Sequence, residues 1–133
     1  MKVLKFGGSS VGSASSIRIV KEILEKQDEP CAVVISASAG VTDRLIHAAQ
    51  LARDQQAAYR EVAEGLLHMH LEMAEDLLQG SVREEAIAEV NSLLNEFMEI
   101  LRGVFQLRDL SPKTQDLILS FGERLSSYLV SRF

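Results

Sequence analysis

A lysine beside a turn of small residues gives the N-terminal end of the chain the chemistry of an anion-binding site. Residues 5–12 read Lys-Phe-Gly-Gly-Ser-Ser-Val-Gly and follow a short apolar run. A strand that passes through such a turn into a helix leaves backbone N–H groups unpaired where the helix dipole favours negative charge. We predict that the backbone N–H groups of this turn bind an anion, of which phosphate is the simplest. Lys5 would stabilise a phosphoryl group during its transfer, which makes it the candidate catalytic residue.

This loop differs from two familiar nucleotide-binding loops. In a Walker A loop the lysine follows the glycines, whereas Lys5 precedes them, and the Gly-x-Gly-x-x-Gly spacing is absent. A flexible turn beside a solvated lysine is therefore the competing interpretation of residues 5–12.

A second turn of small residues carries hydroxyl groups suited to a small polar substrate. Residues 36–43 read Ser-Ala-Ser-Ala-Gly-Val-Thr-Asp and follow the apolar run 31–35. We predict that Ser36 and Thr42 contact the substrate. The alternative is a tight turn in which Thr42 or Asp43 only caps the next helix.

Glu123 is the third candidate for contact with the substrate. It follows Gly122 inside a helical pattern, where glycine costs ~1 kcal/mol relative to alanine, and serines lie on both sides of it. Small neighbours permit close approach by another element or by a ligand. We predict that Glu123 pairs with a substrate ammonium group. The alternative is a surface glutamate on a solvated strip.

The first half of the chain must place both turns, and its pattern predicts alternating strands and helices. We expect strands over residues 2–6 and 31–35, a helix that starts at one of the serines after Gly12 and ends before Pro30, and a helix over residues 42–54. A right-handed crossover makes the strands parallel, so both turns lie at the same carboxyl edge of the sheet. The unbroken apolarity of residues 31–35 predicts a strand covered on both faces.

The second half of the chain predicts only helices. Apolar residues at a 3–4 spacing indicate a helix over residues 57–78, another that starts at the capping box 81–84, and a last one with Ser111 as N-cap and Pro112 in its first turn. The tight link between the first two helices predicts a long antiparallel helical hairpin.

The histidines give no sign of a metal site. None of the three has a partner at a ligand spacing. His70 falls on the apolar seam of its helix, so we expect it at a helix–helix interface. His47 and His68 should be exposed. We predict no metal ligand in the chain.

Composition narrows the possible functions. The 133 residues carry a formal net charge of −5, with the acidic excess after residue 56, and contain no Trp. An acidic chain without a basic stripe argues against nucleic-acid binding. Cys31 is the single cysteine, so no internal disulfide can form. No run approaches the ~20 apolar residues of a membrane span, and Lys2 and Lys5 interrupt any signal-peptide core. We expect a cytoplasmic protein without membrane contact.

Three motifs taken together closely resemble the aspartokinase family, which belongs to the amino-acid kinase fold. They are Lys-Phe-Gly-Gly-Ser-Ser-Val at residues 5–11, Ser-Ala-Ser-Ala-Gly-Val-Thr-Asp at 36–43, and Phe-Gly-Glu-Arg-Leu-Ser-Ser at 121–127. Ser9 stands where the family usually has threonine, and it keeps the hydroxyl group. The resemblance covers the whole chain in order. The overall sequence pattern of the chain is similar to that of the kinase half of bifunctional aspartokinase–homoserine dehydrogenases.

The resemblance implies ATP-dependent phosphorylation of L-aspartate to 4-phospho-L-aspartate, the first step toward lysine, threonine and methionine. By motif position, the contacts to the phosphates of ATP fall on Lys5, Gly7, Gly8 and Ser9. Those to aspartate fall on Ser36, Thr42 and Glu123. Glu123 would pair with the α-ammonium group of the aspartate.

The family's adenosine and Mg²⁺ contacts, its substrate-gripping arginine and its regulatory ACT domains lie further along the chain. We therefore expect the N-terminal portion of an αβα sandwich, with the two loops in residues 1–56, the hairpin in 57–110 and the Glu123 helix in 111–133. Such a fragment would be inactive alone. The rest of a longer chain, or a second copy in a homo-oligomer, would complete its sheet.

Two other functions stay open. Another amino-acid kinase, which phosphorylates glutamate, carbamate or a nucleoside monophosphate, would use similar loops. A non-catalytic module would use the helical hairpin for assembly.

Overall fold

Two short parallel strands and five α-helices make up most of the chain. The computed structural model describes all residues from Met1 to Phe133. In chain order the elements are β1 (Lys2–Phe6), the 3₁₀ turn η1 (Gly8–Val11), α1 (Ala14–Glu25), β2 (Cys31–Ile35), α2 (Val41–Arg53), α3 (Tyr59–Leu77), α4 (Gly80–Leu107) and α5 (Pro112–Arg132). The fold is thus mostly helical, with both strands near the N-terminus.

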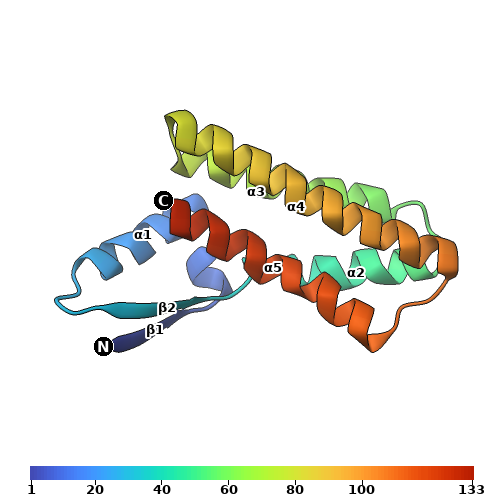
Figure 1. The fold of residues 1–133 in the computed structure, drawn as a ribbon, viewed down its shortest axis with the longest axis horizontal. Helices are drawn as coiled ribbons and strands as arrows, with labels where there is room; N and C mark the ends of the chain where they lie inside the picture. Colours follow the sequence, from blue (N-terminus) through green and yellow to red (C-terminus); the bar gives the residue numbers. More distant parts are fainter.

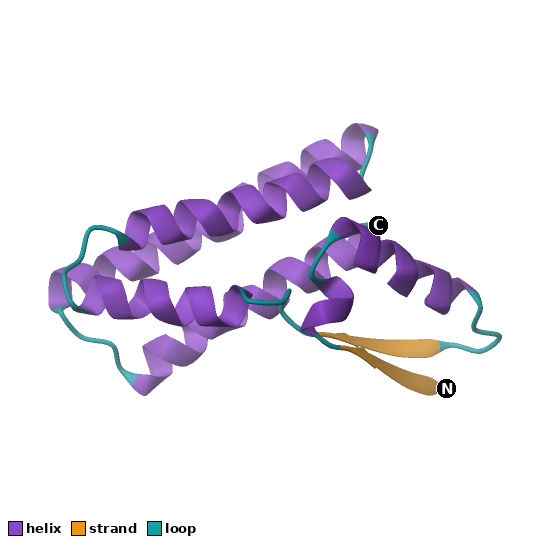
Figure 2. Ribbon diagram, turned by 180° about the vertical axis from the view of Figure 1, so that it is seen from behind, coloured by secondary structure: helices purple, strands orange, loops and turns teal.

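The strands and α1 form one end of the molecule, and the remaining helices extend away from them (Figure 1). α3 and α4 lie side by side along one edge, and α3 also packs against α2. α5 returns from the far end and brings the C-terminus beside α1, as the view from behind also shows (Figure 2). No helix combines the length and apolarity needed to cross a membrane.

The strand pair is parallel, as the crossover rule predicts. Lys2 pairs with Cys31 and the register continues to Phe6 opposite Ile35. Phe6 is buried and Ile35 is half-buried against the core. On the other face of the sheet, Val34 is 47% exposed. The expectation of a strand covered on both faces is therefore wrong for this chain, because its helices pack on one face of the sheet only (Figure 1).

Helix α1 begins and ends where its sequence signals place it. The Ser13 hydroxyl accepts a hydrogen bond from the Ser16 amide, which makes Ser13 the N-cap. The helix ends at Glu25, five residues before Pro30 blocks any continuation. Between β1 and this cap the chain makes the 3₁₀ turn η1, which the sequence did not predict.

The start of α4 differs from the predicted capping box. α4 begins at Gly80, and no side chain caps its first turn. Gly80 has a φ of +59°, which turns the chain sharply enough for the helix to start before Ser81. Arg83 instead points back and donates to the carbonyl oxygens of Leu78 at 2.7 Å and Glu75 at 2.8 Å. The guanidinium thereby satisfies carbonyl groups at the end of α3.

The three histidines lie as their positions in the helical pattern predict. His70 is fully buried, and its Nδ1 atom lies 2.7 Å from the Leu66 carbonyl oxygen. His47 and His68 are exposed, as expected.

Helix α5 begins as its sequence predicts, because the Ser111 hydroxyl accepts a hydrogen bond from the Thr114 amide at 3.1 Å.

Candidate functional site

The two small-residue turns lie against one another at the carboxyl edge of the strand pair. The Ala39 amide donates to the Gly8 carbonyl at 3.0 Å. The Ser38 hydroxyl donates to the Val11 carbonyl at 2.8 Å. One bond joins backbone to backbone and the other joins a side chain to backbone, so the turns form a single unit. We call the turn of residues 7–12 the first loop and the turn of residues 36–40 the second loop.

The structure requires glycine at some positions of these loops, for different reasons, but not at others. A Cβ atom on Gly8 would lie 3.1 Å from the Ala37 carbonyl oxygen, and one on Gly12 would lie 3.3 Å from the Ala39 Cβ. Gly40 has a φ of +80°, where a side chain is strained. Gly7 has neither reason, because its φ is −78° and a Cβ there would meet nothing within 4 Å. Gly7 therefore leaves open space beside the first loop.

Helix α5 presses directly on the second loop. A Cβ atom on Gly122 would lie 2.7 Å from the Ala37 Cβ and 3.4 Å from the Leu45 Cδ1. One turn later, the Ser126 hydroxyl donates to the Ser36 carbonyl at 2.5 Å. The mid-helix glycine thus permits close approach by another element, which is one of the two explanations its sequence context offered.

The structure brings the predicted site residues to one region without bringing their side chains into contact. Lys5, Ser9, Thr42 and Glu123 are exposed, and Gly8 and Ser36 are half-buried. None of the candidate side chains forms an ion pair or a hydrogen bond; Glu123, for example, uses only its backbone carbonyl, which accepts from Ser127. Their functional groups are therefore available to a ligand.

Lys5 and Glu123 form no ion pair, unlike two arginines on α5. Arg124, the residue after Glu123, forms an ion pair with Glu96 at 3.1 Å. Arg132 pairs with Glu85 on the same side of α4. The predicted catalytic lysine and the predicted ammonium-binding carboxylate have no such partner.

The one clear pKa shift in the chain lies away from this site. Burial lowers the pKa of His70, and the nearby Arg44 charge lowers it further, while the hydrogen bond with the Leu66 carbonyl raises it. The His70 Nε2 atom is buried and has no hydrogen-bond partner. His70 is therefore a neutral core residue rather than a proton donor for the site.

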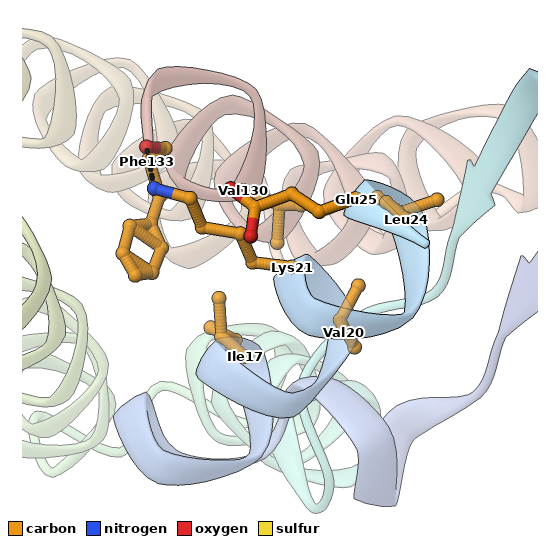
Figure 3. Close-up of a pocket in the computed structure, with 7 residues that line it drawn as sticks. All are labelled: Ile17, Val20, Lys21, Leu24, Glu25, Val130 and Phe133. Carbon is orange, nitrogen blue, oxygen red and sulfur yellow. Dashed lines mark hydrogen bonds between the residues drawn. The ribbon is translucent and has the colours of Figure 1, made fainter. Parts of the chain in front are cut away.

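The main cavities do not include the predicted site residues. A cavity of about 320 Å³ opens between α1 and the end of α5, lined mostly by apolar side chains (Figure 3). The Lys21 Nζ atom reaches across it, donating to the Phe133 carbonyl at 3.3 Å and lying 4.4 Å from the centre of its ring. None of the five main cavities is lined by any predicted site residue. No group of three or more His, Cys, Asp and Glu side chains could hold a metal ion.

Two buried serines near the site were not assigned a role from the sequence. Ser38 and Ser126 each use a hydroxyl to bind a loop carbonyl. The sequence offered one signal, the spacing of four residues between Gly122 and Ser126, which places both on one helical face. It did not show which backbone group that face would meet.

The whole chain, residues 1–133, matches the amino acid kinase family. It is 37% identical over 131 residues to the aspartokinase of Chlamydia trachomatis, covering 98% of this chain and 27% of that protein. It is 29% identical to the chloroplastic bifunctional aspartokinase/homoserine dehydrogenase 1 of Arabidopsis thaliana, of which it covers 14%. The crystal structure of E. coli aspartokinase III in complex with aspartate and ADP superposes with a TM-score of 0.86 at 26% identity, over 98% of this chain and 28% of that one.

The chain therefore spans about a quarter or less of the length of these relatives. The match nevertheless extends over the strands, both loops and all five helices, because it covers the chain from end to end. On this basis, the chain belongs to the amino acid kinase family.

Proposed function

We propose that this chain supplies the phosphoryl-transfer and aspartate-binding part of an aspartate kinase, which converts ATP and L-aspartate to ADP and 4-phospho-L-aspartate. The observation that carries the proposal is the hydrogen-bonded pair of loops with α5 packed on the second of them. This arrangement gathers the three motifs of the chain at one sheet edge. The names of the relatives, and the aspartate and ADP bound in the E. coli structure, support the choice of substrates.

In this proposal the first loop holds the phosphates. The open space at Gly7 lets a bulky anion approach the backbone, and the exposed Ser9 hydroxyl can donate to a phosphate oxygen. Lys5, the next-to-last residue of β1, carries an ammonium group that forms no ion pair. Its charge would offset the negative charge on the transferring phosphoryl oxygens.

The second loop and α5 hold the amino acid. The hydroxyl groups of Ser36 and Thr42 donate to its oxygens, and the Glu123 carboxylate pairs with its α-ammonium group. An oxygen of the substrate's side-chain carboxylate attacks the γ-phosphorus of ATP, and the bond from that phosphorus to the β–γ bridging oxygen breaks. A carboxylate needs no general base, so positioning and charge neutralisation provide the catalysis. We assign no step to Mg²⁺, because the chain holds no cluster of ligand side chains.

The larger setting is part of the same proposal. The exposed apolar face around Val34 supports a second covering layer of an αβα sandwich, and the unpaired outer edges of the two strands support a sheet that continues, either from a longer chain or from a second copy. Within it, residues 1–56 would carry the loops, 57–110 a helical hairpin and 111–133 the helix of Glu123. The product would feed lysine, threonine and methionine synthesis in the cytoplasm.

The test uses a full-length protein that contains this segment. We expect ADP release that depends on L-aspartate and is not supported by L-glutamate, with an acyl phosphate product that hydroxylamine traps as the hydroxamate. Lys5→Met should lower kcat by a factor of about 100 or more, because it removes a charge that acts on the transition state. Glu123→Gln should raise the KM for aspartate by about tenfold or more, because it removes a charge-assisted hydrogen bond.

Matched variants control for charge alone. Lys26→Met removes another exposed lysine that has no ion pair, and Glu84→Gln removes an exposed carboxylate on α4; both should behave as wild type. Residues 1–133 alone should show no turnover. Equal activity with glutamate, or equal effects of Lys5→Met and Lys26→Met, would count against the proposed function.

A further inference from the structure

Two buried hydroxyl groups hold the parts of the candidate site together. Ser38 is 2% exposed and Ser126 is fully buried, and each directs its hydroxyl at a backbone carbonyl of one of the loops. A side chain with so little exposed surface cannot touch a substrate. Any effect of these serines on the reaction must therefore act through the groups they bind.

Ser126 sets the position of α5 on the second loop. Its hydroxyl donates to the Ser36 carbonyl at 2.5 Å, and the contact of Gly122 with Ala37 lies one turn away on the same face. Glu123 belongs to this same turn of α5. The hydrogen bond thus determines where the Glu123 carboxylate stands relative to Ser36.

Ser38 sets the position of the first loop on the second. Its hydroxyl donates to the Val11 carbonyl at 2.8 Å, beside the bond from the Ala39 amide to the Gly8 carbonyl. Gly12 closes the contact, since a Cβ atom there would be 3.3 Å from the Ala39 Cβ. The relative position of the two loops depends on this group of contacts.

We propose that Ser126 and Ser38 are positioning residues, which act on different halves of the reaction. Ser126 aligns Glu123 with the second loop and so determines aspartate binding. Ser38 aligns the first loop with the second and so determines phosphoryl transfer. This inference rests on the proposed aspartate kinase function, but its structural half stands on the hydrogen bonds alone.

The proposal predicts that the two serines affect different kinetic parameters of the full-length protein. Loss of one buried hydrogen bond corresponds to about a 5- to 10-fold effect. We expect Ser126→Ala to raise the KM for aspartate by that factor and to leave the KM for ATP near the wild-type value. We expect Ser38→Ala to lower kcat by a similar factor with little change in the KM for aspartate. Ser131→Ala is the control, because Ser131 lies on α5, is exposed and binds only the Tyr128 carbonyl.

Two further measurements separate positioning from stability. Ser126→Cys keeps nearly the same volume but replaces a strong donor by a weak one, so it should match Ser126→Ala in kinetics even if the alanine variant folds poorly. In a double-mutant cycle, adding Ser126→Ala to Glu123→Gln should raise the KM for aspartate by less than twofold, because the carboxylate that Ser126 positions is already gone.

The outcomes that overturn the proposal differ from those that overturn the function. Additive effects in the cycle, or changes in both KM values and kcat that follow the loss of thermal stability, would show that the serines are merely structural. Amide hydrogen exchange of residues 36–41 should be faster in Ser126→Ala and Ser38→Ala; unchanged exchange would refute the positioning role whatever the kinetics. Wild-type protein without aspartate-dependent ADP release would refute the function instead.

Discussion

The contact of α5 with the second loop can be tested with a single methyl group. Gly122→Ala adds a Cβ atom 2.7 Å from the Ala37 Cβ and 3.4 Å from the Leu45 Cδ1. The Ala37 methyl group is attached directly to the backbone and cannot rotate away. The loop or the helix must therefore move.

Two opposing terms determine the size of the effect. Overpacking of a dense core costs about 1–3 kcal/mol, whereas alanine is favoured over glycine within a helix by ~1 kcal/mol. Gly103→Ala in α4 is the matched control, since a Cβ there meets nothing within 4 Å. We expect Gly103→Ala to stabilise the chain by roughly 0.5–1 kcal/mol. Gly122→Ala should be less stable than Gly103→Ala by about 1–3 kcal/mol, because the helix-propensity gain is common to both.

Urea unfolding followed by circular dichroism measures this difference. The midpoint should rise in Gly103→Ala and should be lower in Gly122→Ala than in Gly103→Ala, while the m value stays constant. Ala37→Gly added to Gly122→Ala removes the clashing methyl group and should recover part of the lost stability. If Gly122→Ala stabilises the protein as much as Gly103→Ala does, then α5 does not lie against Ala37 as described, and the arrangement of the candidate site is wrong.

Two further predictions concern the first loop and the core histidine. Gly7→Ala should change the free energy of unfolding by less than about 0.5 kcal/mol, because its Cβ meets open space at an ordinary φ, yet it should raise the KM for ATP in the full-length protein; a large loss of stability would contradict this. Burial lowers the pKa of His70 below its ordinary 6.5, so the neutral side chain is fully accommodated above about pH 6.5. Below that pH the free energy of unfolding should fall, by up to ~1.4 kcal/mol per pH unit, until the lower folded-state pKa is reached. His70→Leu should lack this component in urea titrations between pH 7 and pH 5, and equal pH slopes in both proteins would refute it.

Local signals in the sequence predict most of the elements because those elements depend on their own residues. The Ser13 cap, the break at Pro30 and the Ser111 cap each act within one or two helical turns, and all three match the structure. The predicted helix start at the capping box of residues 81–84 is wrong because another local signal, Gly80, overrides it. The positive φ of Gly80 lets α4 begin earlier. The carbonyl groups at the end of α3 that lack a helical partner accept hydrogen bonds from Arg83 instead.

Predictions that depend on distant residues were less complete. The rule for parallel strands correctly placed both loops at one edge, because it follows from connectivity alone. The exposure of Val34 could not be predicted from the apolar run 31–35. Apolar residues indicate that a sheet face is to be buried, but not which segment buries it. The roles of Ser38 and Ser126 depend on carbonyl groups 27 and 90 residues away, and no periodicity encodes such pairings.

The span of the Ser126–Ser36 hydrogen bond also has a consequence for biosynthesis. The two loops leave the ribosome early, but the helix that completes their arrangement is made 90 residues later. Contacts so far apart in sequence form slowly, since a long stretch of chain must be ordered before they gain anything. A nascent chain that has reached α3 therefore already has both loops, which can bond to each other through Ser38 and Ala39, but it lacks the helix that packs on the second loop. The second loop gains its hydrogen bond with Ser126, and Glu123 reaches this region, only when α5 has been made.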